Sequence, residues 1–328
     1  MTTRPDQETG ATSNRWRSSR RWRVLLSATT VASLLVVGLV AGPSQAQTTV
    51  CTGNISNIIT PGDLQVPDGQ ACVLTMVLVT GNANVGAGSD LFLIDSTVAG
   101  GLAVGSSGFA QVTDSTVNNG STLLNSFALL AEGSTLSDGV DVDGGMFFGT
   151  GTNVNGAVDS SNGWTYLENG QVSGYLTTDQ DNATDLFDLT MAGSVTVDRA
   201  TTGSVICRST FSGAVTVTRS DGLIQLGGEA PTPLCGSNVL TGGVTLTDNT
   251  ADEVLVASNL ILGNVSCSGN SASPAGSGNL ILGTAGGQCT GLSTNSFGAE
   301  PAPDGATQTE RRDAILAALA DRGGSPSR

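Results

Sequence analysis

The stretch that decides the fold is Ser209-Thr-Phe-Ser-Gly-Ala-Val-Thr-Val217. A small and a polar residue precede an apolar one, a turn follows, and an alternating strand comes after the turn. The same unit recurs through the middle of the chain at nearly constant steps. Its apolar positions are Val98, Val117, Leu136, Val154, Val172, Met191, Phe211, Val239, Leu260 and Leu280. A period of about 19 residues predicts a solenoid, in which each turn buries its apolar residues against its neighbours.

Two columns of the repeat alignment have a physical meaning. The residue before each apolar position is polar and uncharged, from Thr97 to Asn279. Stacked strands lie about 4.7–4.9 Å apart, so such side chains can form hydrogen-bonded ladders. Two residues after the first seven apolar positions stands a Gly, Asn or Asp, from Gly100 to Gly213. These residue types tolerate positive φ, so we expect a left-handed bend at that corner of every turn.

Helical periodicity is absent from Cys51 to about Gly298, and short apolar alternations cut by Gly, Asn, Asp and Ser fill this range. This pattern is typical of an all-β fold. The strict six-residue repeat of a left-handed β-helix is missing. The sequence therefore predicts a right-handed parallel β-helix (β-solenoid) of about ten turns, formed by residues 47–298.

Residues 1–46 resemble an export signal. An Arg-rich segment precedes an apolar run from Val24 to Ala41, and Ser44-Gln-Ala46 is a small-residue cleavage site. A retained membrane anchor is the competing interpretation, but Ser and Thr dilute the apolar run. We expect cleavage, no stable membrane span afterwards, and a secreted or cell-wall associated protein. Arg20-Arg21 leaves open both the general and the twin-arginine export route.

The composition changes again after Gly298. Residues 299–328 are predicted to form a Pro/Gly linker and a short helix from Glu310 to Asp321. Ile315, Leu316 and Leu319 share one side of this helix. We expect it to be docked on, or frayed from, the last turn of the solenoid.

All six cysteines lie in the predicted exported part, and an even count in an oxidising compartment indicates disulfides. Six cysteines allow 15 pairings. Consecutive cysteines are separated by one turn or slightly more, so stacking brings them within bridging distance. This predicts the pairs Cys51–Cys72, Cys207–Cys235 and Cys267–Cys289.

Charge and composition exclude several functions. Residues 47–328 carry seven Arg against 26 acidic residues, which gives a net charge of −19. Such a surface repels nucleic acid and anionic membranes. The chain has no His and no Lys, so His-dependent triads, His metal sites and Lys chemistry are excluded. The expected partners are cell-wall or extracellular polysaccharides or surface proteins.

Acid chemistry remains available. Asp95 and Asp114 fall in register on adjacent turns, three positions before the apolar residue, and Glu132 is shifted by one residue in the next turn. Paired carboxylates at close range are what a glycosidase requires. The simpler interpretation is that both side chains point to solvent at a turn.

A second candidate is the oxygen-rich loop Thr178-Asp-Gln-Asp-Asn-Ala-Thr-Asp185. Asp179, Asp181 and Asp185 are calcium-ligand types, but the EF-hand glycine and the distal Glu are missing. A solvated turn is the favoured interpretation, with calcium as the alternative and no other cofactor expected. Asp141-Val-Asp143-Gly-Gly is a weaker candidate of the same kind.

At the level of the fold, residues 51 to about 297 resemble the secreted right-handed parallel β-helix proteins of the pectin-lyase-like kind. Gly263-Asn-Val-Ser-Cys-Ser-Gly-Asn270, with Pro274, Gly278-Asn279 and Gly287-Gln-Cys289, resembles a terminal unit of uncharacterised exported actinobacterial proteins. The resemblance implies a shape more than an activity. Polysaccharide lyases of this kind use a basic residue, and the repeat region offers only Arg199, Arg208 and Arg219.

Taken together, the sequence favours an exported structural or surface-interaction β-helix protein of the envelope or extracellular space, without evident catalytic machinery. The alternative is a carbohydrate-active enzyme, a polysaccharide hydrolase or lyase, that uses Asp or Glu on one face of the β-helix.

Overall fold

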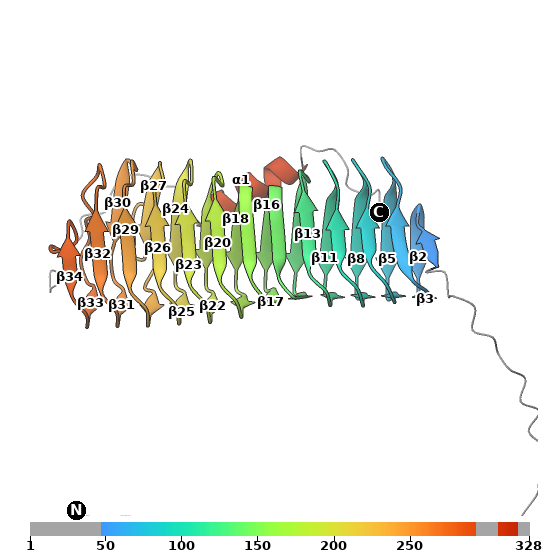
Figure 1. Cartoon of the computed structure of the whole chain (residues 1–328), viewed down its shortest axis with the longest axis horizontal. Helices are drawn as coiled ribbons and strands as arrows, with labels where there is room; N and C mark the ends of the chain where they lie inside the picture. Colours follow the sequence, from blue (N-terminus) through green and yellow to red (C-terminus); the bar gives the residue numbers. More distant parts are fainter. Residues whose placement is uncertain (1–46, 293–307, 321–328) are drawn as a thin grey trace, which may run out of the picture. The chain divides into compact units, whose positions relative to one another are not determined.

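The computed structural model describes residues 47–292 and 308–320. Within them the chain forms a parallel β-solenoid of about 13 turns followed by one helix, α1 (Gln308–Ala320) (Figure 1). The predicted all-β solenoid and its repeat period are confirmed. The expected number of turns, about ten, is too low because the first and last turns do not carry the pattern of the central unit. The predicted signal peptide, residues 1–46, lies outside the described residues.

Each turn contributes strands to three faces. The strands of the first face, in order of pairing, are β1 (Thr48–Val50), β4 (Asp63–Val66), β7 (Ala83–Val85), β10 (Leu102–Val104), β13 (Ser121–Leu124), β16 (Val140–Thr150), β18 (Val158–Glu168), β20 (Leu176–Asp179), β23 (Val195–Asp198), β26 (Val215–Thr218), β29 (Val244–Thr247), β32 (Val265–Ser268) and β34 (Ala285–Gly287). Neighbours in this series are paired in parallel and in register.

The second face follows in each turn. Its strands are β2 (Gly53–Ser56), β5 (Ala71–Thr75), β8 (Asp90–Ile94), β11 (Phe109–Thr113), β14 (Ala128–Glu132), the second halves of β16 and β18, β21 (Thr184–Phe187), β24 (Gly203–Cys207), β27 (Leu223–Leu226) and β30 (Glu253–Val256). Because β16 and β18 run through both faces without a break, the first and second faces form one 22-stranded sheet.

The third face is a separate 12-stranded sheet of short strands. They are β3 (Ile59–Thr60), β6 (Leu78–Val79), β9 (Thr97–Val98), β12 (Thr116–Val117), β15 (Thr135–Ser137), β17 (Asn153–Asn155), β19 (Gln171–Val172), β22 (Thr190–Met191), β25 (Thr210–Phe211), β28 (Val239–Leu240), β31 (Leu260–Ile261) and β33 (Leu280–Ile281). One residue of each strand faces the core, from Thr60 of β3 to Ile281 of β33.

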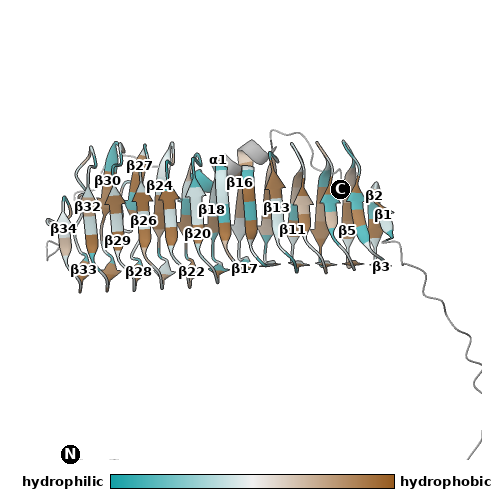
Figure 2. Ribbon diagram, viewed as in Figure 1, coloured by the Kyte–Doolittle hydropathy of each residue, from teal (hydrophilic) through white to brown (hydrophobic). Residues whose placement is uncertain are grey.

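Alternation along the strands builds the core (Figure 2). Val195 and Val197 of β23 are fully buried, whereas Thr196 between them is partly exposed, as expected for side chains that point alternately to the two sides of a sheet. Copies of these residues stack from turn to turn into one hydrophobic core. The column from Leu102 to Val215 points inward as expected, and Ser121 occupies its place in that column as a buried residue.

The glycine column has a different cause from the one expected. Of the seven residues in this column, Asp138 has the predicted positive φ, 62°, but Asn119 and the five glycines, Gly100, Gly156, Gly174, Gly193 and Gly213, do not. Instead, a Cβ on Gly193 would lie 2.3 Å from the carbonyl oxygen of Gly174 in the preceding turn, far inside contact distance. Glycine is needed there because successive turns approach closely, and the glycines stack on each other.

The left-handed residues that recur from turn to turn lie at two other corners. One column follows the first face, from Gly69 to Gly287, and the other follows the second face, from Asn57 to Gly278. Both contain many residues other than Gly, among them Asn, Asp and Arg with φ near 50°. In each turn the chain therefore makes two αL bends, which the sequence pattern alone did not locate.

Buried polar ladders run along these corners, but in a register that differs from the predicted one. Phe211 pairs with Leu240, not with Val239, so the last three predicted apolar positions are wrong by one residue. The residues of the predicted polar column therefore belong to two different columns in the structure. The outward part, Thr97 to Thr210, lies on the third face, and Asn238, Asn259 and Asn279 join an inner column that contains Ser96, Ser115, Ser134 and Ser209.

In this inner column a side chain of one turn accepts a hydrogen bond from the backbone of the turn before. The amide N–H of Asn238 donates to Oδ1 of Asn259 at 3.1 Å, and the amide N–H of Asn259 donates to Oδ1 of Asn279 at 3.1 Å. Asn259 Nδ2 in turn donates to the Leu226 carbonyl at 2.8 Å. Each buried amide thus satisfies backbone groups that the corner leaves without a strand partner.

The three predicted disulfides are confirmed. Cys51–Cys72 and Cys267–Cys289 lie inside the hydrophobic core near the first and last turns. Cys207–Cys235 lies on the outside of the second face, where it ties the insertion before β28 to β24. The two end disulfides close turns that have a stacking neighbour on one side only.

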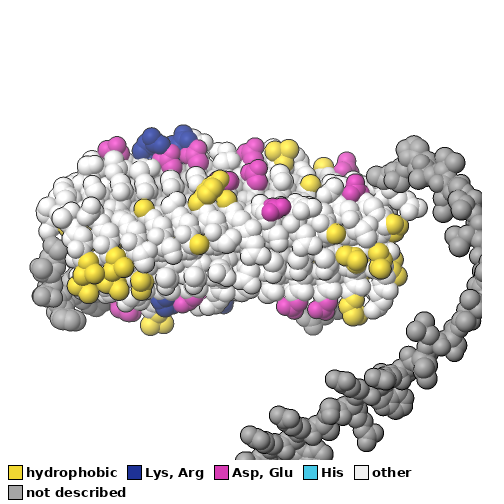
Figure 3. Space-filling view, turned by 60° about the horizontal axis from the view of Figure 1, so that its bottom comes forward, with side chains coloured by type: hydrophobic (Ala, Val, Ile, Leu, Met, Phe, Trp, Pro, Cys, Tyr) yellow, Lys and Arg dark blue, Asp and Glu magenta, His cyan; other side chains and the backbone are white. Residues whose placement is uncertain are grey.

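The outward side of the third face carries hydrophobic residues near its two ends (Figure 3). Ile59 and Leu78 are exposed at the N-terminal end, and Leu262, Leu280 and Leu282 at the C-terminal end. Between them the outward residues are polar or small. In the described part of the chain, no helix is both long and apolar enough to span a membrane.

Replacing Asn259 with Ala tests the ladder. The change leaves the buried N–H of Asn238 without an acceptor, which should lower the free energy of unfolding by about 1–3 kcal/mol in urea denaturation. Asn54→Ala is the matched control, because Asn54 is exposed on the second face. Equal losses for the two variants would contradict the structural role of the inner column.

Candidate functional site

Asp95 and Asp114 stand side by side on adjacent turns, as predicted, and Glu132 is offset by one residue from them. Both are exposed, and both occupy the αL corner after the second face, with φ of 49° and 47°. Asp tolerates this conformation better than most residues. Their alignment thus follows from the repeated corner, and their catalytic role stays a prediction.

The three predicted calcium ligands have three different environments. Asp179 lies on the outside of the first face and forms an ion pair with Arg199 at 2.5 Å. Asp181 is buried in a corner, and Asp185 is buried beneath α1 on the second face. In the described ranges no three His, Cys, Asp or Glu residues form a group that could hold a metal ion. Calcium binding by this loop stays a prediction from the sequence.

Asp181 is fully enclosed by donors. It accepts hydrogen bonds from Ser160 Oγ at 2.8 Å, from Thr165 Oγ1 at 3.0 Å and from the amide of Gly163 at 2.9 Å. Burial raises the pKa of Asp181, and these hydrogen bonds oppose the shift. The side chain takes the place in the corner column that Ala200, Ser220 and later Asn residues take in the following turns.

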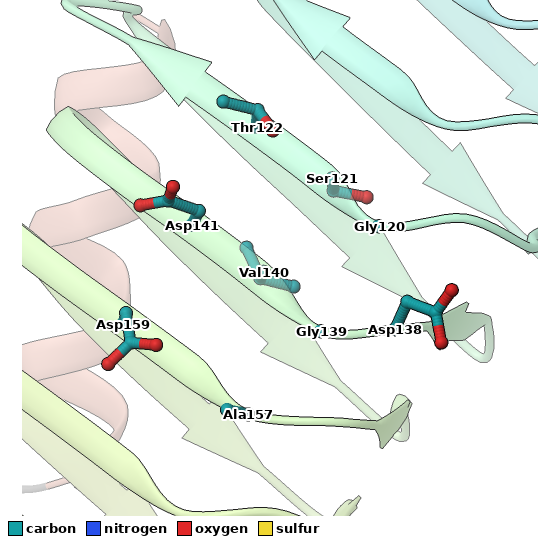
Figure 4. A pocket seen from close by; sticks show the side chains of 9 residues that line it. All are labelled: Gly120, Ser121, Thr122, Asp138, Gly139, Val140, Asp141, Ala157 and Asp159. Atoms are coloured by element: carbon teal, nitrogen blue, oxygen red, sulfur yellow. The ribbon is translucent and has the colours of Figure 1, made fainter.

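A shallow trough crosses the outside of the first face. Its larger hollow, of ≈ 220 Å³, is lined among others by Thr122, Asp138, Asp141 and Asp159. Figure 4 shows Thr122, Asp141 and Asp159 next to one another on β13, β16 and β18. A smaller hollow of ≈ 120 Å³ continues toward β10 and β7 and shares Gly120 and Thr122 with the first.

The register explains why these side chains meet. Thr122 pairs with Asp141, and Asp141 pairs with Asp159, so the three residues form one outward column. The same column continues through Thr177, Thr196, Thr216 and Thr245. Neighbours in such a column lie about 4.8 Å apart along the solenoid axis.

An aromatic ring adjoins the carboxylates. Tyr175 is 47% exposed, and its hydroxyl donates to Asp159 Oδ2 at 3.1 Å. This hydrogen bond raises the pKa of the Tyr175 phenol. An exposed ring beside hydrogen-bond acceptors can pack against an apolar surface while the acceptors bind hydroxyl or amino groups. The trough therefore suits an extended polar chain better than a small enclosed ligand.

The sequence singled out Asp141 only as a weak calcium candidate and did not identify Asp159 or Tyr175. These two residues are 16 positions apart and meet only because turns stack. The repeat period does place Asp141 and Asp159 at the same position of adjacent turns. The sequence did not show where the αL residues lie, and so it did not show which strand residues face outward.

Helix α1 covers a second polar site. Arg311 donates to both carboxylate oxygens of Asp185, at 2.9 and 2.6 Å, and Asp185 is fully buried. Burial raises the pKa of Asp185, and the Arg311 guanidinium opposes that shift. Gln308 bridges Glu168, through Nε2 at 2.8 Å, and Arg208, through its oxygen.

Apolar contacts accompany these bonds. Leu316 packs against the outward cluster of the second face, which contains Phe148, Tyr166 and Phe187. The rings of Phe148 and Tyr166 are stacked with centroids 4.7 Å apart. The predicted docked helix is thus present, but it lies on central turns and not on the last turn. Its hydrogen bonds go to β18 and β21 and to the residue after β24, because the apolar outward cluster is there.

Comparison with known proteins adds little. No protein-family model and no curated protein matches the chain. Among solved structures, the crystal structure of a hyper-glycosylated TibA fragment, with glycosylation catalysed by TibC, aligns with a TM-score of 0.34 and 15% sequence identity. The alignment covers 74% of this chain and 92% of that fragment. Identity and TM-score are too low for this likeness to bear on function.

Replacing Arg311 with Ala tests the docking of α1. The variant leaves the Asp185 carboxylate without its partner, and breaking a buried pair costs up to about 3–5 kcal/mol. We expect a lower melting temperature than for Arg312→Ala, the control, in which a more exposed guanidinium 4.0 Å from Glu168 is lost. Adding Asp185→Asn to Arg311→Ala should restore part of the loss, and the absence of any restoration would contradict the proposed pairing.

Asp181→Asn should change the pH dependence of stability. Because burial raises the pKa of Asp181 above the unfolded value of about 3.9, the folded state holds the proton more tightly. The stability from this group is fully present below about pH 4 and is lost as pH rises through the raised pKa. Relative to wild type, the variant should therefore gain unfolding free energy between pH 3 and pH 7, measured by urea denaturation. Asp95→Asn controls for the loss of one carboxyl group, and a falling relative stability would contradict the assignment.

Proposed function

We propose that the chain is an exported surface-interaction protein that binds extended polysaccharide on the trough of the first face. The observation that carries the proposal is the column Thr122, Asp141 and Asp159 on three stacked strands, with the Tyr175 ring beside it. Stacked turns present the same type of group at a constant spacing, which suits a polymer whose own units repeat.

The charge of the chain narrows the ligand class. A net charge of −19 over residues 47–328 repels acidic polymers. Carboxylates accept hydrogen bonds from sugar hydroxyls and attract amino groups. Neutral and amino-sugar polysaccharides are therefore the favoured ligands, and a surface protein with a basic patch is the other partner of matching charge.

Extracellular location is part of the proposal. Three disulfides are typical of oxidising compartments. The arginine-rich leader with its cleavage site supports export, with the mature protein secreted or retained at the wall.

Binding to immobilised neutral, amino-sugar and acidic polysaccharides tests the function. We expect binding to the first two classes and an affinity loss of about tenfold or more in Asp141→Asn/Asp159→Asn, since a hydrogen bond to a charged group contributes about 1.5–3 kcal/mol. Asp95→Asn/Asp114→Asn makes the same charge change at the exposed corner and should bind normally. Equal losses in both double variants, or binding to acidic polymers alone, would overturn the proposal.

The second candidate is a polysaccharide-degrading enzyme. Asp141 and Asp159 are paired on adjacent strands, and retaining glycosidases hold two carboxyl groups about 5–5.5 Å apart. The binding assays should therefore be accompanied by detection of released reducing ends. Turnover that is lost in either double variant would identify the enzyme and the pair responsible, Asp141 with Asp159 or Asp95 with Asp114.

A further inference from the structure

The outward side of the third face is uncharged over its whole length. Its first column consists of Ile59, Leu78, Thr97, Thr116, Thr135, Asn153, Gln171, Thr190, Thr210, Val239, Leu260 and Leu280. The second column, two residues later, runs from Pro61 through Thr80, Ala99, Asn118, Ser137, Asn155, Ser173, Ala192, Ser212 and Thr241 to Leu262 and Leu282. None of these residues is charged, although the chain carries 28 acidic residues.

The first column is also nearly palindromic. Both ends are apolar, with Ile59 and Leu78 at one end and Leu260 and Leu280 at the other. Moving inward from the two ends, Thr97 corresponds to Val239, and the next correspondences are Thr116 with Thr210, Thr135 with Thr190, and Asn153 with Gln171. A column that reads alike from both ends meets residues of its own kind when one copy is reversed.

We propose that the third face is the contact surface of an antiparallel homodimer. The twofold axis lies in the interface, along the strands and between β17 and β19, so that each column faces the same column of the partner. A closed twofold interface requires one patch that is complementary to itself. This arrangement places Ile59 against the partner's Leu280 and Asn153 against the partner's Gln171.

Apolar burial at the two ends favours this arrangement. Ile59 is 66% exposed, Leu280 is 58% exposed and Leu282 is 64% exposed. Exposed apolar groups of this size at both ends of one face are typical of an interaction surface. In a parallel dimer the first column would face the partner's second column, so that Leu260 and Leu280 would meet apolar residues but Ile59 and Leu78 would meet Pro61 and Thr80. In the reversed copy the first column pairs apolar residues with apolar residues at both ends, and the second column places Leu282 and Leu262 against the partner's Pro61 and Thr80.

The central amides and threonines supply matched polar groups. Asn153 and Gln171 can each donate and accept, so they can pair across the twofold axis. Thr135 opposite the partner's Thr190 can do the same with hydroxyls. Because no charge is buried, the contact avoids the desolvation cost of burying a charged group.

The charged residues at one edge of the third face are also compatible with the antiparallel dimer. The αL corner beside the first column carries Asp114 in the fourth turn from one end and Arg208 in the fourth turn from the other. Reversal places Asp114 opposite the corner of the partner's Arg208, which is already paired with Asp188 of its own chain, so no unpaired like charge opposes Asp114. Asp95 and Asp188 face the partner's Gly236 and Gly133, so this edge brings no two acidic residues opposite each other.

The size of the surface is sufficient. Twelve strands spaced about 4.8 Å apart span roughly 55 Å, and two outward columns are about 11 Å wide. This gives roughly 600 Å² for each subunit and about 1,200 Å² in total, which is the lower end of the range for specific interfaces. We therefore expect a reversible dimer whose mass depends on concentration.

Sedimentation equilibrium of the purified protein between about 1 and 100 µM tests the association. We expect a dimer at the upper concentrations, and a shift of the midpoint by tenfold or more toward higher concentration in Leu280→Asp. Leu124→Asp is the matched control, because Leu124 is 53% exposed on the first face. A wild-type monomer at 100 µM, or equal shifts in both variants, would overturn the proposal.

Thiol cross-linking tests the orientation. All six native cysteines are in disulfides, so introduced cysteines are the only free thiols. With a short bismaleimide, the double variant Ile59→Cys/Leu280→Cys should form a covalent dimer, and each single variant should not. A mixture of the single variants Leu280→Cys and Leu282→Cys marks the parallel arrangement, because that arrangement puts position 280 of one chain opposite position 282 of the other. Cross-linking in that mixture without cross-linking of the double variant would overturn the antiparallel dimer.

Discussion

The structure depends on the hydrogen bond between each turn and the next. In a parallel solenoid the strands satisfy most backbone groups by stacking, but corners interrupt that pattern. Buried Ser, Asn and Gln side chains complete the pairing at the corners, for example where Asn249 accepts from the amide of Ser220 and Asn270 accepts from the amide of Asn249. Every turn must therefore place hydrogen-bonding side chains at the same positions as the turn before it, which accounts for the repeat in the sequence.

Because each turn must pair with the next, the fold could largely be predicted from the sequence. The repeat period and the alternation along strands were sufficient for the fold class, and the cysteine spacing was sufficient for the disulfides. The insertion between Phe211 and Leu240 was long enough for a one-residue error in alignment, since Val239 and Leu240 are both apolar. Only packing distinguishes them, because Leu240 is buried and Val239 is partly exposed.

The candidate site was harder to predict for a related reason. Asp95 and Asp114 were predicted as a pair because they occupy the same position of adjacent turns. In a solenoid, however, a residue type can recur at one position simply because every turn needs the same αL conformation there. Asp141 and Asp159 also repeat, but they lie in a strand that points them outward over a trough. The residue pattern alone does not distinguish an outward strand position from a corner, because that difference depends on where the αL residues fall. Likewise, the partner of Asp185 lies 126 residues away in α1.

The position of α1 has a consequence for how the chain reaches its final form. In a solenoid each turn contacts only its neighbours, so turns can assemble one after another from the first that is available. Helix α1 breaks this locality, because it binds residues of the central turns from the far end of the chain. Until α1 has been synthesised, Asp185 and the aromatic cluster of the second face lack the helix that covers them. The central turns therefore reach their final packing only after all the turns that follow them in the chain have been made.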